Sequence, residues 1–213
     1  GIQSTSSPFS SITTGLPMNQ AAFDKKVFSV PSSTFPACGL FLHASAVLGP
    51  KGAILLLGHS GSGKTSLCKI LSPYFSLIAD DITFVCRRKC GVWEVRDGDS
   101  FRPELFKNRS VSKNMVQKAP AYPLGSIIRI FASQSTVLQP LAPMKLCEYL
   151  MDAVFEIDIQ RKTIRSDLTV QWFHHVAAIA KQNKGWQLQF ALDKKLILSA
   201  FQGAGGEWAK NTG

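Results

Sequence analysis

The sequence lacks any apolar run that approaches the ~20 residues of a transmembrane helix, and it does not open with a charged-then-apolar leader. We therefore expect a cytoplasmic protein with no membrane-spanning part. Acidic residues are also scarce, because 14 Asp and Glu stand against 24 Lys and Arg, for a net charge of +10. This excess favours anionic partners such as nucleotide phosphates, an acidic peptide or protein, a nucleic acid or a membrane surface.

Cysteine is infrequent and odd in number, which argues against a disulfide framework. Cys86 and Cys90, in CRRKC, resemble half of a zinc site, but no second CxxC or HxxxH lies nearby. We interpret CRRKC as a turn with two incidental thiols. The five cysteines, expected to be reduced, are Cys38, Cys68, Cys86, Cys90 and Cys147.

The length of 213 residues and a hydrophobic content of 45% fit one domain with a substantial core. Residues 1–22 are rich in Ser, Thr, Gly and Pro, and we expect a flexible arm there. We expect a single nucleotide-binding domain over residues 23–203 and a flexible tail over 204–213.

Hydrophobic periodicity and turn residues predict the elements of this domain. The run 52–58 is apolar on both faces, as a buried central strand is, and GPKG joins it to the preceding strand as a hairpin-type turn. Expected strands are 27–30, 40–48, 52–58, 76–81, 82–88, 92–96, 126–132 and 186–192. Expected helices start at the end of GHSGSGKT and stop before Pro73, then span 143–156, 167–184 (with Gly185 just past the end) and 193–201. This order predicts an α/β domain with a mixed β-sheet and flanking helices.

The stretch GHSGSGKT satisfies the P-loop pattern GxxxxGK[ST], and it lies between a buried strand and an amphipathic helix. Glycines let the backbone amides turn inwards to surround a phosphate. Lys64 can reach the β- and γ-oxygens of ATP, and the Thr65 hydroxyl can ligate Mg²⁺. The residues predicted to bind nucleotide are Gly58, His59, Ser60, Gly61, Ser62, Gly63, Lys64, Thr65 and Ser66.

Asp80 and Asp81 end the next strand. Mg²⁺ prefers oxygen ligands, so we expect the metal site to comprise Thr65, Asp80 and Asp81. One aspartate can hold the metal while the other accepts the proton of an attacking hydroxyl. Neighbouring residues of a strand face opposite ways, so both serve one site only if the strand ends or twists there. Taken alone, paired aspartates are also typical of a solvated strand end or a cap.

Residues 40–84 resemble the core of the HPr kinase/phosphorylase and phosphoenolpyruvate carboxykinase superfamily. The matching features are His43 in HASA, the narrower form GxSGxGK[ST] at residues 58–65, and ADD ending at Asp81. The resemblance implies that His43 belongs to the site around the metal and phosphates. Without it, a histidine among apolar residues is more often a core group.

The closer similarity is to the small HPr kinase-related proteins, in which a strand and helix similar to YPLGSIIRIF and LQPLAPMKLCEYLMDAV follow. The implied fold is that of the HPr kinase C-terminal domain and the carboxykinases. The HPr kinase signature, similar to EIRGLGI, has no counterpart after Asp81. The sequence therefore does not predict HPr itself as the acceptor.

Phosphoryl transfer also needs cations, and the segment 96–118 supplies several. Among these residues we favour Arg102, because Pro103 stiffens the chain beside it. For any single one of them, a solvated basic loop is the more frequent alternative. On the late helix, we interpret Trp172 as a core anchor and His174 and His175 as helix surface. The basic candidates are Arg96, Arg102, Lys107, Arg109, Lys113 and Lys118.

We therefore predict an ATP-dependent, Mg²⁺-dependent kinase that phosphorylates a hydroxyl of a protein, a peptide or a small molecule. An acidic acceptor suits the basic segment, and a homo-oligomer is left open. One alternative is a catalytically weak nucleotide-binding partner protein with a basic interface. A nucleic-acid-stimulated ATPase is less favoured, because no second ATPase motif is present. The predicted catalytic residues are His43, Lys64, Asp80, Asp81 and Arg102.

Overall fold

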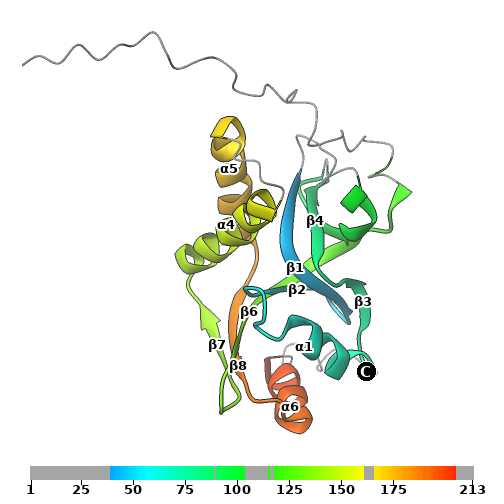
Figure 1. Cartoon of the computed structure of the whole chain (residues 1–213), viewed down its shortest axis with the longest axis vertical. Coiled ribbons are helices and arrows are strands. Elements are labelled where there is room, and N and C mark those ends of the chain that lie inside the picture. Colours follow the sequence, from blue (N-terminus) through cyan, green and yellow to red (C-terminus); the bar gives the residue numbers. More distant parts are fainter. Residues whose placement is uncertain (1–38, 89, 104–114, 116–117, 161–165, 205–213) are drawn as a thin grey trace, which may run out of the picture. The chain divides into compact units, whose positions relative to one another are not determined.

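The computed structural model describes residues 39–88, 90–103, 115, 118–160 and 166–204 (Figure 1). Its strands are β1 Gly39–Gly49, β2 Gly52–Leu57, β3 Ser76–Ala79, β4 Ile82–Arg87, β5 Trp93–Asp97, β6 Tyr122–Ala132, β7 Val137–Leu141 and β8 Gly185–Phe190. Its helices are α1 Lys64–Leu71, α4 Pro143–Gln160, α5 Ser166–Gln182 and α6 Lys194–Ala204, with a 3₁₀ turn, η2, at Asp99–Phe101. The protein is thus α/β with flanking helices, as predicted. The arm 1–22 and the strand 27–30 lie outside the described residues.

The strands form a mixed sheet of eight in the order β2-β1-β4-β5-β6-β8-β7, with β3 added beside β1. Strand β2 runs parallel to β6, and β6 runs parallel to β8, whereas the other pairs are antiparallel. Because β2 pairs with both β1 and β6, the strands β2, β1, β4, β5 and β6 close on themselves. This closure brings parts of the chain that are distant in sequence to one end of β2.

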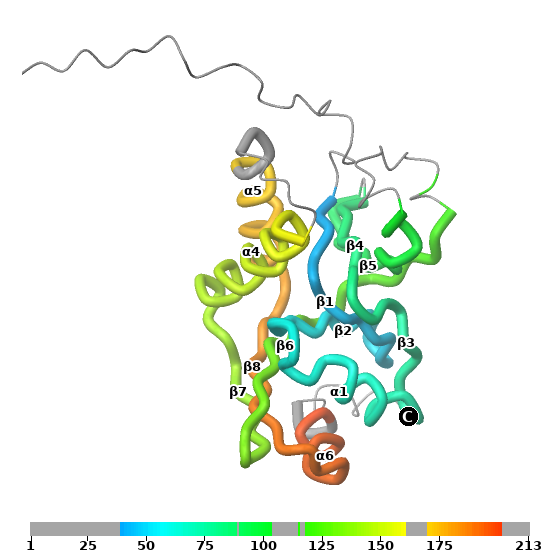
Figure 2. Tube along the Cα trace, in the orientation of Figure 1, coloured from blue at the N-terminus to red at the C-terminus, as the bar shows by residue number. Residues whose placement is uncertain are grey.

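Strand β2 is buried on both faces, as its uninterrupted apolar sequence predicts. Leu55 and Leu57 pack in a cluster with residues of α4 and α5, while Ile54 and Leu56 pack in a cluster with residues of α1 and α6. Figure 2 shows α4 and α5 on one side of these strands and α1 and α6 on the other. Each such side chain contributes about 1.5–3 kcal/mol by its burial. Strand β2 is therefore a rigid support for the loop that follows it.

Several details differ from the sequence prediction, among them the start of β6 at Tyr122, four residues before the predicted position. Strand β7 was not expected, because Pro140 lies within it; it pairs only with β8, and such an edge strand tolerates proline. Gly185 begins β8 and does not end the preceding helix, and a Cβ there would lie 2.9 Å from Leu146 Cδ2. Helix α4 continues to Gln160, and Ala204, placed in the expected tail, is the last residue of α6.

The predicted core anchor is confirmed, since Trp172 is buried and its ring contacts that of Phe155. His174 is exposed, whereas His175 is half-buried with its ring against Trp93. The four cysteines within the described residues form no disulfide, and burial raises the pKa of Cys68 to about 11. None of the described helices combines the length and the apolar character needed to cross a membrane.

Candidate functional site

Strand β1 passes from one pairing partner to another at His43. Residues Gly39 to His43 pair with β4, and residues Ala44 to Gly49 pair with β2. At this crossing the backbone N–H of Ala44 donates a hydrogen bond to the carbonyl oxygen of Asp81 at 3.0 Å. The pairing register therefore places His43 beside Asp81 and beside the end of β2. The His43 side chain is buried, which orients it within this junction.

Residues 58–63, here named the glycine loop, connect β2 to α1. Gly61 and Gly63 have φ angles of +79° and +94°, which side chains rarely adopt. A Cβ on Gly58 would lie 2.2 Å from Ser62 Oγ. A Cβ on Gly61, by contrast, would meet nothing within 4 Å, so the space above this residue is open. The glycines allow the backbone conformation of the loop, and the absence of a side chain at Gly61 leaves open space beside the loop backbone.

The Lys64 ammonium lies over the glycine loop and uses all of its donors. It donates to the carbonyl oxygens of Gly58 at 2.5 Å and His59 at 3.2 Å, and to His43 Nε2 at 3.0 Å. An ammonium group has three N–H bonds, so its hydrogen-bonding capacity is filled. Burial, as the main cause, lowers the pKa of Lys64. The cation is thus fixed at the start of α1, against the loop.

His43 connects Lys64 to Asp81. Since Lys64 donates to Nε2, the ring proton belongs on Nδ1, which lies 3.0 Å from Asp81 Oδ1. This approach is off the N–H direction, so it is an electrostatic contact and not an aligned hydrogen bond. Burial first, and then Lys64, lower the pKa of His43, while Glu156, whose Oε1 lies 3.5 Å from Nε2, opposes them. His43 is therefore a neutral bridge between a cation and a carboxylate.

Asp80 and Asp81 share one site because strand β3 ends at Ala79. Both aspartates lie in the bend that precedes β4, which satisfies the condition set by the sequence. The Thr65 hydroxyl donates to Asp80 Oδ1 at 3.3 Å, whereas Asp81 faces His43 and Arg102. The two carboxylates therefore have different neighbours. Asp80 adjoins the start of α1, and Asp81 adjoins the buried His43–Lys64 pair.

Arg102 lies at this site, as the sequence suggested. Its guanidinium donates to the Asp81 carboxylate and, at 2.7 Å, to Asp99 Oδ1, and these two bonds raise the pKa of Arg102. Asp99 Oδ2 in turn accepts the backbone N–H groups of Asp81 at 3.2 Å and Asp80 at 3.4 Å. Asp99 thus holds the bend that presents the aspartate pair. Asp99 was not predicted as a site residue, although a turn-forming run, DGDS, surrounds it.

Of the other basic candidates, only Arg96 and Lys118 lie within the described residues. Arg96 has a structural role: it donates to the carbonyl oxygen of Ala119 and, at 3.3 Å, to the buried Glu94. Lys118 is exposed. Three candidates, Lys107, Arg109 and Lys113, lie outside the described residues.

Two charged residues near the site were also missed by the sequence analysis. Glu156 belongs to α4 and reaches His43, and only packing of α4 on β1 brings it there. Arg129 is buried on β6 next to Leu57 of β2, and its guanidinium lies 4.9 Å from the Phe131 ring and 4.7 Å from the Tyr149 ring. Burial lowers the pKa of Arg129. The signal that could have identified Arg129 is a charged residue inside the apolar run SIIRIFA.

The oxygen ligands available for Mg²⁺ lie at the start of α1. Among the described residues no group of three or more His, Cys, Asp or Glu is arranged to hold a metal. Mg²⁺ bound with a nucleotide takes one or two carboxylates and completes its shell with phosphate oxygens and water. Thr65 and Asp80, whose oxygens lie 3.3 Å apart, fit that need. Gly61 has open space beside it, and Lys64 contacts the carbonyl oxygens of Gly58 and His59 in the same loop, so an anionic group suits this region.

A scan against protein-family models and a search of the curated proteins each found no match to this chain. The similarity of residues 40–84 to the HPr kinase and carboxykinase superfamily thus stays a hypothesis. The chemistry assigned to the site rests on its own geometry.

Proposed function

We propose that this protein is an ATP-dependent kinase whose glycine loop is a P-loop of the HPr kinase type. The observation that carries this proposal is the chain of contacts from Lys64 through His43 to Asp81. It joins a cation on a glycine-rich loop to a carboxylate at the end of a neighbouring strand. A kinase needs such a pair, because one group neutralises phosphate charge and the other receives the proton of the acceptor.

Lys64 and the loop amides would bind the β- and γ-phosphates. The Lys64 ammonium now donates to two carbonyl oxygens of the loop, and phosphate oxygens are stronger acceptors that replace them. His43 keeps the third donor occupied and limits the movement of the ammonium. The start of α1 adds its own unpaired N–H groups to the same position.

Thr65 and Asp80 are the residues that would hold Mg²⁺, which supplies charge neutralisation of the phosphates when bound. Asp81 would accept the proton of the acceptor hydroxyl as its oxygen bonds to the γ-phosphorus, with ADP leaving. Arg102 lies beside Asp81 and would supply positive charge to the oxygens of the γ-phosphoryl group during its transfer. Asp99 positions both aspartates through their backbone N–H groups.

Labelled ATP tests the proposal. The full chain is incubated with [γ-³²P]ATP, Mg²⁺ and a cell extract, and transfer of label to protein and to small molecules is measured. Lys64→Ala should abolish transfer, and Asp81→Asn should lower its rate strongly. The matched control is Lys69→Ala, because Lys69 is an exposed lysine on the same helix and should be dispensable. Transfer that survives Lys64→Ala would refute the proposal.

The two aspartates can be separated by their dependence on metal. Asp80→Asn should raise the Mg²⁺ concentration needed for half-maximal activity, because Asp80 adjoins Thr65. Asp81→Asn should lower turnover at saturating Mg²⁺ and leave the metal requirement unchanged. If the two variants exchange these effects, the roles assigned to Asp80 and Asp81 are reversed.

One observation favours the alternative of a nucleotide-binding partner protein with weak catalysis. Both oxygens of Asp81 already have cationic or polar neighbours, Oδ1 facing His43 and Oδ2 facing Arg102. These contacts compete with an acceptor hydroxyl for the oxygens of the Asp81 carboxylate. ATP binding that depends on Lys64, without transfer of label to any component of an extract, would support this alternative over the kinase.

A further inference from the structure

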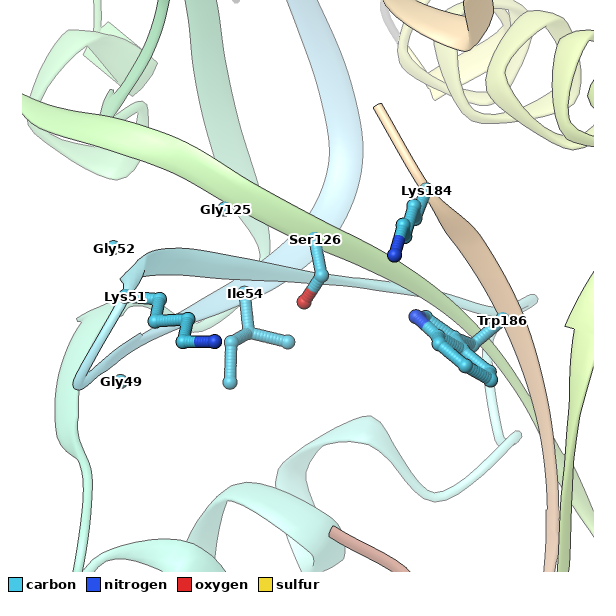
Figure 3. Close-up of a pocket in the computed structure, with 8 residues that line it drawn as sticks. All are labelled: Gly49, Lys51, Gly52, Ile54, Gly125, Ser126, Lys184 and Trp186. Carbon is cyan, nitrogen blue, oxygen red and sulfur yellow. The ribbon is translucent and has the colours of Figure 1, made fainter. Parts of the chain in front are cut away.

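A polar pocket lies at the end of β2 that is opposite to the glycine loop. It has a volume of about 120 Å³ and is formed where β2, β6 and β8 begin (Figure 3). The glycine loop follows the other end of β2, so the two sites are separated by the length of that strand. A single ordered water occupies about 30 Å³ of liquid, so the pocket has room for a larger polyatomic group.

The hydroxyl of Ser126 is an unpaired polar group inside this pocket. Ser126 is 3% exposed, and its Oγ has no hydrogen-bond partner among the described residues. Figure 3 shows the oxygen pointing into the space between the lining side chains. Buried hydroxyl groups are nearly always paired, and an unpaired one destabilises the fold. Such a hydroxyl can donate to a water molecule or to a ligand bound in the pocket.

A β-bulge directs Ser126 to this position. Ala53 of β2 pairs with Leu124, and the next residue, Ile54, pairs with Ser126, so Gly125 is the extra residue of β6. A Cβ on Gly125 would lie 2.8 Å from the carbonyl oxygen of Lys51, so only glycine allows this close contact. Bulges reorient the side chains that follow them and are frequent beside functional sites. The backbone thus fixes the Ser126 hydroxyl in the pocket.

The remaining polar lining consists of donors and carries positive charge. The side chains of Lys51 and Lys184 extend over the pocket, and the indole nitrogen of Trp186 faces the same space (Figure 3). The residues that line the pocket include no Asp or Glu. The positive charges of Lys51 and Lys184 both favour an anionic ligand in this pocket.

We propose that this pocket is a binding site for a small tetrahedral oxyanion, with phosphate as the ligand chemistry. Lys51, Ser126, Lys184 and Trp186 come from the starts of three neighbouring strands and approach from different directions. A tetrahedral oxyanion accepts hydrogen bonds from several directions, whereas a carboxylate accepts mainly in one plane. The Ser126 hydroxyl donates to the anion and thereby gains its missing partner. This site is independent of the proposed kinase site and would exist if that proposal failed.

Titration of the full chain with inorganic phosphate, followed by calorimetry, tests the proposal. Lys64→Met removes the cation of the glycine loop, so the phosphate binding that this variant retains reports on the pocket. Ser126→Ala should weaken phosphate binding about tenfold, and Lys51→Gln with Lys184→Gln should weaken it further. Ser135→Ala is the matched control, since Ser135 is an exposed serine in the turn after β6.

Thermal unfolding with and without phosphate gives an independent readout. Ser126→Ala should unfold at the same or a higher temperature than the parent chain, because it removes an unpaired hydroxyl, and it should lose the stabilisation that phosphate confers. Phosphate binding that is unaffected by the Ser126 and lysine variants, or that disappears with Lys64→Met, would overturn the proposal. Acetate binding as strongly as phosphate, with the same dependence on Ser126, would overturn the phosphate assignment.

Discussion

Alanine at Gly61 and at Gly63 should separate the two requirements on the glycine loop. Both residues have positive φ, +79° and +94°, so each alanine variant incurs about 1–2 kcal/mol of backbone strain. Their surroundings differ. The Cβ of Gly63→Ala would lie 2.9 Å from Phe190 Cζ, whereas that of Gly61→Ala would meet nothing within 4 Å.

The contact with Phe190 sets the size of the difference. Phe190 is 2% exposed and packs in the cluster that contains Ile130 and Leu188, so its ring has little room to move. Overpacking of this kind costs about 1–3 kcal/mol. Gly63→Ala should therefore lower the free energy of unfolding by about 2–5 kcal/mol, and Gly61→Ala by only about 1–2 kcal/mol.

Urea unfolding followed by circular dichroism measures these values, provided that the slope of the unfolding free energy against urea concentration is the same for all variants. Phe190→Leu should recover part of the loss in Gly63→Ala, because it removes the atom in contact, and should not help Gly61→Ala. Gly61→Ala should nevertheless bind ATP at least about tenfold more weakly, since its methyl group enters the open space over the loop. Equal destabilisation by the two variants would refute the packing argument, and unimpaired ATP binding by Gly61→Ala would contradict the nucleotide site.

Three further predictions concern the residues around the loop. Arg96→Gln should destabilise the protein by about 3 kcal/mol in urea, because it removes a partner of the buried Glu94, while kinase activity per folded molecule is retained. Arg102→Gln should do the reverse, with a stability change below about 1 kcal/mol and a clear loss of phosphoryl transfer; the same outcome for both arginines would contradict this division. The pKa of His43 is lowered in the folded chain. Below pH 6.5, the ordinary pKa of histidine, the imidazole is therefore protonated in the unfolded chain before it is protonated in the folded chain. Stability should therefore fall as pH drops below 6.5, and His43→Asn should lose this dependence; an unchanged pH profile of the urea midpoint in the variant would argue against a buried neutral imidazole. Asp99→Asn should lower turnover about tenfold with little change in ATP affinity, because Asp99 positions the aspartates and does not adjoin the loop, and a loss of affinity alone would be inconsistent with that role.

Local sequence patterns predicted most of the elements. The run GAILLL is apolar at every position after its first residue, and it is a strand buried on both faces. The amphipathic helix after the glycine loop also begins and ends where glycine, lysine and Pro73 place it. Strand β7 was not predicted because Pro140 argues against a strand unless the strand lies at an edge. Edge position is a property of the whole sheet, which local patterns do not contain.

The candidate site divides in the same way. The pattern of Gly58, Gly63 and Lys64 was enough to predict the loop. The end of an apolar run was enough to place Asp80 and Asp81 at a strand end. Asp99 and Glu156 were missed because each reaches the site through packing of a distant element, η2 or α4. Ser126 was likewise missed, since its position depends on a bulge in the pairing of β2 with β6.

By itself the sequence determined a phosphate-loop pattern after a buried strand, two carboxylates on the next strand and a mixed α/β architecture. Only the tertiary structure decided how these parts meet. Strand β1 changes partner at His43, which brings the Lys64 cation and the Asp81 carboxylate to either side of one imidazole. The physical reason is strand register. A shift of one residue would turn His43 to the other face of the sheet, and the register is set by contacts between residues that are distant along the chain.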